Sequence, residues 1–408
     1  MSQTRRDFLR STGLVALGLN APLFVSRTAA HAAPGHKPGA KDTILVVVEL
    51  NGGNDGLNTV IPFKHPLYAK YRPTLQQPTA QIKKLTDEIG LHPQLTGFAD
   101  LHQEGHLCIV QGVGYPNPDQ SHFRSMDIWQ AASTAQNLTE GWIGKALKQM
   151  PATPSFHLKG SGERSPLALN GAPARVPSIA SLQDFQLQVA SGTDAKAQRE
   201  VIEGSAKSGG TRKPGLLDFV QRTASNTYAS SRRLQEIGKN YQPKATYPQT
   251  ALANKLKLAA QLIDGNFGAR LFYVSLEGFD THAQQAGAHA NLLQQLSAAV
   301  TAFFKDLSAR GHKDRLLVMT FSEFGRRAKE NGSRGTDHGS AAPMFLIGGK
   351  VKAGLVGAHP DLEKIPMNNL VHHTDFRQVY AAVLDQWLGV SSKDVLGGEF
   401  KPVDVLKS

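Results

Sequence analysis

The stretch TILVVVEL (43–50) is followed at once by the segment NGGNDGLN (51–58). A continuous run of β-branched and other apolar residues is typical of a strand that is covered on both faces, as in the parallel sheets of α/β proteins. Ligands of an open α/β sheet gather beyond the carboxyl ends of its strands. The polar, glycine-rich segment is therefore the first candidate for a binding site.

The rest of the chain repeats this alternation of strand-like runs and helical patterns. Such alternation predicts an α/β fold with a largely parallel central sheet and helices on both faces. The strand-like runs are residues 43–50, 106–113, 269–276, 314–321 and 342–349, and the helical patterns are residues 95–105, 255–264, 291–310 and 374–389.

The middle of the chain has a different composition. Residues 187–215 are polar and glycine-rich, with few large apolar side chains. Such a segment cannot bury enough apolar surface to form a core layer, so we expect an inserted lid. We place it in an insertion around residues 151–250 of a domain that spans residues 43–408.

The amino-terminal residues have the layout of a cleaved export signal. Arg5 and Arg6 precede a short apolar run and small residues, which predicts a twin-arginine signal peptide over residues 1–32 and a tether over residues 33–42. The alternative is a membrane anchor, but the run is shorter than the ~20 residues that a spanning helix needs. We expect the twin-arginine machinery to export the folded protein to the periplasm or outside the cell. Cys108 is the single cysteine, so no intrachain disulfide can form.

The chain is basic, with a formal net charge of +12. This charge favours anionic substrates, whether small molecules or polymers, although solvated lysines are the more ordinary explanation. No basic run is interleaved with aromatic residues, so we expect no nucleic-acid partner. No later segment is apolar enough to predict a membrane span in the mature chain.

Acidic, imidazole, hydroxyl and guanidinium side chains follow several of the predicted strands or precede the next element. Zinc binds imidazole nitrogen and carboxylate oxygen, so the acids and histidines form a candidate site for a divalent metal. Each motif taken alone has an ordinary alternative as a turn, a cap or a solvated surface. The candidates are Asp55 after residues 43–50, Ser121 and Arg124 in QSHFRS, Asp280 and His282 in GFDTH, Glu323 and Arg326 in SEFGRR, and Asp337 and His338 in GTDHG.

Taken together, the motifs GGNDGLN, SHF, GWIG, GFDTH, SEFGRR, GTDHG and DFRQVYAAVL resemble the bacterial domain-of-unknown-function family 1501. The resemblance covers nearly all of the mature chain. That family is grouped with the alkaline-phosphatase-like superfamily, which includes metal-dependent phosphatases, sulfatases and phosphoglycerate mutases. The resemblance therefore implies the fold, and it implies a reaction only by analogy.

The resemblance also implies roles for single residues. Ser121 matches the superfamily's nucleophile at a helix start, and Glu323 takes the place of a metal-binding acid. Phe324 stands where the superfamily has a further metal-binding histidine, and Asp337 is a possible replacement for that histidine. We therefore expect one or two divalent ions, with zinc as the first candidate, and His122 as a residue that supports a ligand.

The function that follows is an exported metal-dependent hydrolase of an anionic ester, with phosphate ahead of sulfate. In this hypothesis Ser121 is the nucleophile, and Arg124 or Arg326 holds two oxygens of the substrate through bidentate hydrogen bonds. The alternative is a non-catalytic binding or cell-surface protein that keeps the fold. Phe324 favours the alternative, whereas the histidine and aspartate motifs favour the enzyme.

Overall fold

The computed structural model describes residues 42–150, 153–182, 236 and 238–407 of the 408 residues. The predicted signal peptide (1–32), nearly all of the tether (33–42) and the predicted lid (187–215) lie outside the described residues. Among the helices that are described, none is both long and apolar enough to cross a membrane.

Strand β1 (Ile44–Asn51) lies in the middle of the fold. Successive side chains of a strand point to opposite faces. Val46 and Val48 accordingly lie in one hydrophobic core and Leu45 and Val47 in the other. All four are fully buried. The apolar run that predicted a strand covered on both faces is confirmed.

Nine strands form the central sheet, in the order β11-β5-β10-β9-β1-β8-β6-β7, with β12 paired to β5. The pairs of β1 with β8 and β9, of β6 with β7 and β8, and of β5 with β11 and β12 are parallel. Strand β10 runs antiparallel to both β9 and β5. The bounds are β5 (Leu107–Gly114), β6 (Ser155–Leu158), β7 (Ser178–Ile179), β8 (Leu271–Glu277), β9 (Leu316–Phe321), β10 (Ala342–Gly348), β11 (Gly354–Val356) and β12 (Thr374–Asp375).

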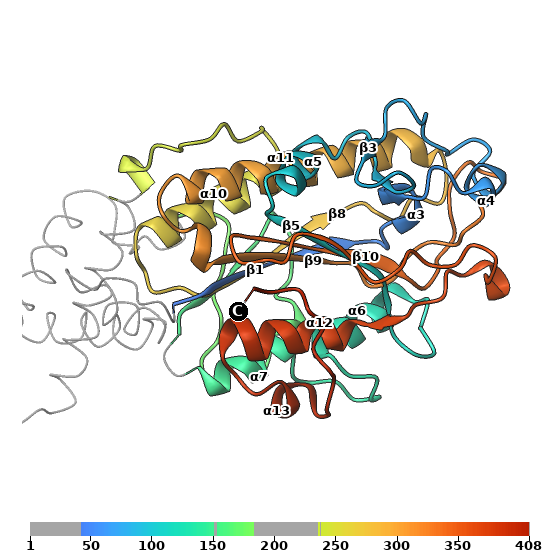
Figure 1. The fold of residues 1–408 in the computed structure, drawn as a ribbon. Coiled ribbons are helices and arrows are strands. Elements are labelled where there is room, and N and C mark those ends of the chain that lie inside the picture. The colour runs from blue at the N-terminus through green and yellow to red at the C-terminus, as the bar shows by residue number, and fades with distance from the viewer. Residues whose placement is uncertain (1–41, 151–152, 183–235, 237, 408) are drawn as a thin grey trace, which may run out of the picture.

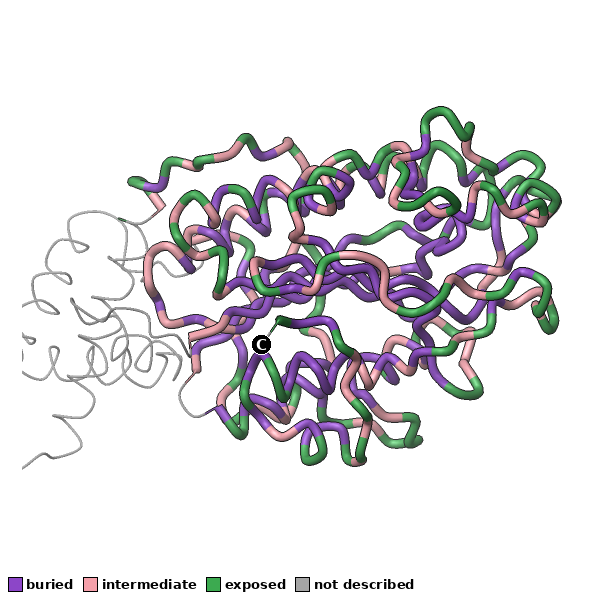
Figure 2. Tube along the Cα trace, in the orientation of Figure 1, coloured by how far each residue is buried: buried purple, intermediate pink, exposed green. Residues whose placement is uncertain are grey.

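Helices cover both faces of the sheet, as predicted (Figure 1). The tube in Figure 2 shows the strands as a buried layer between the two helical layers. One layer holds α5 (Thr96–Gln103), α10 (Ala251–Asp264) and α11 (Gln285–Ser308), and the other holds α6 (His122–Ala131), α7 (Trp142–Gln149), α12 (Phe376–Ala382) and α13 (Ser392–Leu396). The shorter elements are α3 (Gly56–Thr59), α4 (Pro66–Tyr71) and a small sheet of β2 (Val60–Ile61), β3 (Lys83–Lys84) and β4 (Gly90–Leu91).

Helix boundaries follow local signals that hydrophobic periodicity misses. Helix α12 begins with a capping box, in which Asp375 and Gln378 satisfy each other's backbone N–H groups. Helix α11 begins at Gln285, whereas the apolar pattern predicted a start at Asn291. The added turns are rich in alanine, which favours helix without producing an apolar stripe.

Candidate metal centre

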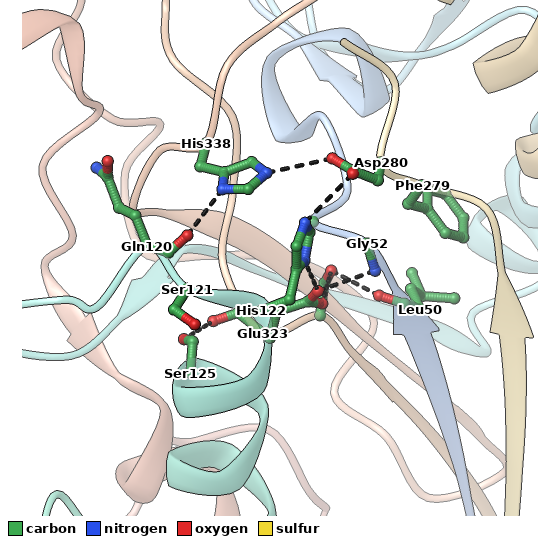
Figure 3. Close-up of polar contacts among 12 residues, drawn as sticks. Leu50, Gly52, Gln120, Ser121, His122, Ser125, Phe279, Asp280, Glu323 and His338 are labelled. Carbon is green, nitrogen blue, oxygen red and sulfur yellow. Dashed lines mark hydrogen bonds and ion pairs between the residues drawn. The ribbon is translucent and has the colours of Figure 1, made fainter.

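Segments distant in the sequence meet at the edge of the sheet where β1, β8 and β9 end. Because β10 is antiparallel to β9, its amino end lies at this same edge and brings the preceding loop with it. The amino end of α6 reaches the edge as well, since His122 contacts Glu323, which lies two residues beyond the end of β9. Figure 3 shows His122 and His338 directed toward Asp280.

The residues that gather there are His122, Asp280, His282 and His338, named here the histidine–aspartate cluster. Nε2 of His282 and Nε2 of His338 lie 2.9 and 3.2 Å from Oδ1 of Asp280, and Nε2 of His122 lies 3.4 Å from Oδ2. The two Nε2 atoms of His282 and His338 are 2.9 Å apart. Ligand atoms of His122, Asp280 and His338 all lie within 4.8 Å of one another. The predicted residues Asp280, His282 and His338 are thus brought together.

Hydrogen bonds behind the cluster orient two of its imidazole rings. Nδ1 of His338 lies 2.7 Å from the backbone carbonyl oxygen of Gln120, and Nδ1 of His122 lies 2.8 Å from Oε1 of Glu323. A carbonyl or carboxylate oxygen accepts a hydrogen bond, so Nδ1 of each ring carries the proton. In the neutral ring, Nε2 then keeps the lone pair that a metal requires.

His282 repeats the same arrangement with a longer contact. Its Nδ1 lies 3.5 Å from Oδ1 of Asp337, while its Nε2 faces Asp280. Asp337 is in turn held by the side-chain amide of Asn331 at 3.0 Å. Glu323 and Asp337, both predicted as ligands, therefore lie behind imidazoles that point into the cluster.

Asp280 is ionised in this environment. Partial burial by itself would raise the pKa of Asp280. The hydrogen bond and charge of Arg326, together with the neighbouring imidazoles of His338 and His282, outweigh burial and lower this pKa to about 2. The carboxylate is therefore available as an anionic ligand at any pH above that value.

The donor set fits a divalent cation. Nε2 of His122 is buried and makes no hydrogen bond within the described part of the chain, although it faces the cluster. A buried polar atom without a partner is costly, and a metal ion would satisfy it. The hydrogen bond to Glu323, helped by the charges of Glu323 and Asp280, raises the pKa of His122 above its ordinary value. A metal must displace any proton on Nε2, so its affinity should fall as the pH decreases.

Arg326 supports the cluster from behind. Its guanidinium is fully buried and donates to the backbone carbonyls of Gly52, Gly53, Phe279 and Thr336 and to Oδ1 of Asp280. All its nitrogens are engaged, so the guanidinium orients Asp280 and has no free edge for the substrate oxygens that the sequence assigned to it.

Asp55 lies outside the cluster. Its buried carboxylate accepts two hydrogen bonds from Arg72, at 2.5 and 2.8 Å, and one from Gln285 at 2.5 Å. Burial alone would raise the pKa of Asp55, but the charge and hydrogen bonds of Arg72 outweigh it and lower the pKa. The geometry gives Asp55 an ion pair inside the protein in place of the predicted contact with a metal.

Two further predicted residues lie at the start of α6. Ser121 occupies the position before the first helical residue and is exposed, and its hydroxyl makes no hydrogen bond to the described residues. The guanidinium of Arg124 donates to the backbone carbonyls of Thr134 and Ala135 at 2.8 and 2.6 Å. The serine hydroxyl is free to react, whereas the arginine is held by its own helix and the turn beyond it.

Phe324 occupies space that a second histidine was expected to use. Its buried ring packs against the rings of His122 and His338, with centroids 5.0 and 4.6 Å apart. An apolar ring in this place offers no ligand, so the contacts favour a single ion in the cluster.

These features define the class of the protein: an α/β protein that carries a solvent-accessible histidine–carboxylate cluster at the carboxyl edge of its sheet. The chain belongs to the family described as "Protein of unknown function (DUF1501)", whose profile matches residues 42–399. The family predicted from the sequence motifs is confirmed. A comparison with curated proteins found no match.

Solved structures that resemble the chain share little sequence with it. The sulfatase PsFucS1 from Pseudoalteromonas sp. is 11% identical, with 97% of this chain and 74% of that chain covered and a TM-score of 0.42. The zinc complex of the C-terminal periplasmic domain of EcEptC from Escherichia coli is 12% identical, with 75% and 72% covered and a TM-score of 0.34. A protein in the alkaline phosphatase superfamily from Vibrio parahaemolyticus is 9% identical, with 92% and 77% covered and a TM-score of 0.36.

Proposed function

We propose that the protein is an exported, metal-dependent hydrolase of an anionic ester, with a phosphate ester ahead of a sulfate ester. One observation carries the proposal. Three imidazole Nε2 atoms converge with the carboxylate of Asp280, and each imidazole has its other nitrogen directed at an oxygen acceptor. Histidine ligands of metals are held in this way by carboxylates and carbonyls.

The cluster would hold one zinc ion through His122, Asp280, His282 and His338. When bound, zinc acts as a Lewis acid that polarises an ester oxygen and lowers the pKa of a neighbouring hydroxyl. Three neutral imidazoles and one carboxylate leave a divalent ion with a net charge of about +1, which attracts an anion. A doubly charged phosphate monoester gains more from this charge than a singly charged sulfate ester does.

The residues of the chain supply the remaining chemistry. Ser121 is the nucleophile of the proposal: its Oγ gives its proton to solvent and bonds to phosphorus, while the bond to the leaving oxygen breaks and that oxygen takes a proton from water. Water then hydrolyses the phosphoseryl group, which releases phosphate and restores the serine hydroxyl. Its place before α6 supports this role, since a helix amino end stabilises a neighbouring anion. Arg326 keeps Asp280 ionised and oriented, and Arg124 would need to leave its carbonyl partners to reach the substrate.

Metal analysis tests the proposal first. Protein purified without chelator should carry about one equivalent of zinc, since the cluster offers one set of ligands. His122→Ala and His338→Ala should each lose most of it. His102→Ala is the matched control because His102 is a partly exposed histidine on α5, away from the cluster. Equal zinc content in wild type and all three variants would refute the assignment of the metal site.

Turnover tests the reaction. The zinc-loaded protein should hydrolyse 4-nitrophenyl phosphate faster than 4-nitrophenyl sulfate, and Ser121→Ala should abolish turnover while keeping the metal. Retained zinc without any turnover of either ester would favour the second candidate, a non-catalytic binding protein. The packing of Phe324 against His122 and His338 is the observation that supports this second candidate.

A further inference from the structure

A large polar cavity lies beside the histidine–aspartate cluster. Its volume is about 460 Å³, and its walls come from the ends of β1 and β8, from α6 and from residues 163–170. Phe123, in the wall, directly follows His122. Asn51, also in the wall, precedes Gly52, whose N–H donates to Glu323 at 2.9 Å. A ligand in this cavity therefore lies next to the cluster.

The cavity wall contains carboxyl oxygens that lack partners. Both hydrogen bonds to Glu49, from Tyr273 and Gln130, end on Oε2. Glu49 is only 5% exposed and lines the cavity, and no described group donates to its Oε1. Oε2 of Glu163, in the same wall, is buried and accepts no hydrogen bond from the described residues, although Nε2 of His157 lies 4.0 Å away. Two acceptor positions are thus left for the hydroxyl groups of an occupant.

The charge of the wall favours a neutral polar occupant over a cation, because Asp127 and Arg164 carry opposite charges and the other acids are largely neutralised. Lys255 donates to Oε1 of Glu163 at 2.5 Å and neutralises it. Burial raises the pKa of Glu49 to about 7 and also raises the pKa of Glu277. Near neutral pH, Glu49 is about half protonated, so its carboxyl group can both donate and accept hydrogen bonds.

Phe123 gives the cavity an exposed aromatic wall. It is 88% exposed, although it follows His122 on the first turn of α6. Ligand pockets combine aromatic walls with a few convergent polar groups, and Phe123 lines this cavity together with Glu49 and Glu163. The C–H face of a sugar ring packs on an aromatic ring, while its hydroxyl groups bind carboxyl and amide groups.

We propose that this cavity binds a sugar, or another polyhydroxylated group, that forms the non-ester part of the substrate. The volume suits one or two sugar rings, because ligand pockets of about 300–1,000 Å³ hold molecules of that size. The claim that the sugar is part of the substrate rests on the proposed ester hydrolysis, whereas the claim that the cavity binds a neutral sugar does not. An experiment can therefore refute either claim without refuting the other.

Saturation-transfer NMR with neutral sugars tests the cavity directly. Glucose, galactose, mannose and N-acetylglucosamine are the probes, with choline as the cationic alternative. At least one sugar should bind the full-length protein. Phe123→Ala and Glu49→Gln should each weaken sugar binding about tenfold, because Phe123→Ala removes an aromatic contact and Glu49→Gln removes a hydrogen-bond acceptor. Met367→Ala, which removes an equally exposed apolar side chain elsewhere, should leave binding unchanged.

The His338→Ala variant separates this inference from the proposed function. Sugar binding should persist in that variant even though its metal is lost. If none of the four sugars at about 20 mM, a concentration at which millimolar affinities are detectable, received saturation from the protein, the inference would be overturned. Binding of choline alone, or equal binding by wild type and Phe123→Ala, would overturn it as well.

Discussion

Replacement of Glu49 by Gln should make the stability of the protein less sensitive to a rise in pH from about 5 to about 8. Glu49 is buried near the end of β1 between Tyr273 and Gln130, and no cationic side chain of the described residues is bonded to it. Burial raises the pKa of this carboxyl group from 4.5 to about 7. The folded protein therefore holds the proton more tightly than the unfolded chain does.

The sign and size of the effect follow from this difference. Below about pH 4.5 the carboxyl group is protonated in both states and contributes no penalty. As the pH rises, the unfolded chain releases its proton first, so the folded state loses stability until the pH passes about 7. A pKa raised from 4.5 to about 7 costs about 3 kcal/mol in full, of which about 2.5 kcal/mol develops between pH 5 and pH 8.

Urea unfolding at about pH 5 and about pH 8 measures this quantity in wild type and Glu49→Gln. Glutamine keeps an oxygen for the hydrogen bonds from Tyr273 and Gln130 but does not ionise. The free energy of unfolding of wild type should fall by about 2.5 kcal/mol more than that of the variant between the two pH values. An equal fall in both proteins would refute the reasoning, since all other titrating groups are shared.

Two other buried charges should be sensitive to conservative changes. Arg326→Lys should lower the free energy of unfolding by about 3 kcal/mol or more, because a lysine cannot reproduce the buried guanidinium's bonds to four backbone carbonyls; an unchanged urea midpoint would contradict this. Asp306→Asn should cost about 2 kcal/mol in the same assay, since Asp306 accepts hydrogen bonds from Tyr241, Tyr247 and Arg310. A loss below about 0.5 kcal/mol would place Asp306 among ordinary surface residues.

The fold could be predicted because its main signals are local. The run 43–50 is apolar at every position but Thr43 and Glu49, so a buried strand was the natural reading. The reversed direction of β10 could not be read from its composition, because a strand covered on both faces looks the same in either direction. That reversal is what brings His338 to the edge where β8 ends.

The site was predicted in part, because its partners are far apart in the sequence. Asp280, His282 and His338 were expected to meet, and they do. His122 was read as a supporting residue and Glu323 as a ligand, whereas the structure places Nε2 of His122 in the cluster and Glu323 behind it. The two residues are 201 positions apart, so only the tertiary fold decides which of them faces the cluster.

Asp55 provides the sharpest contrast between a residue's place in the sequence and its contacts. The sequence placed it among the metal ligands because it follows β1, but its carboxylate is fully buried against Arg72. Asp55→Asn should leave that guanidinium charged without a carboxylate partner, and removal of one member of a buried ion pair costs about 3–5 kcal/mol.

The same variant should keep its metal. The histidine–aspartate cluster does not contain Asp55, so Asp55→Asn should retain about as much zinc as wild type while its urea midpoint falls. Metal analysis and urea unfolding on one preparation give both results, and Asp280→Asn serves as the contrasting variant because it removes a cluster carboxylate. If Asp55→Asn lost its zinc with an unchanged midpoint, Asp55 would be a ligand and the ion pair with Arg72 would be incidental to stability.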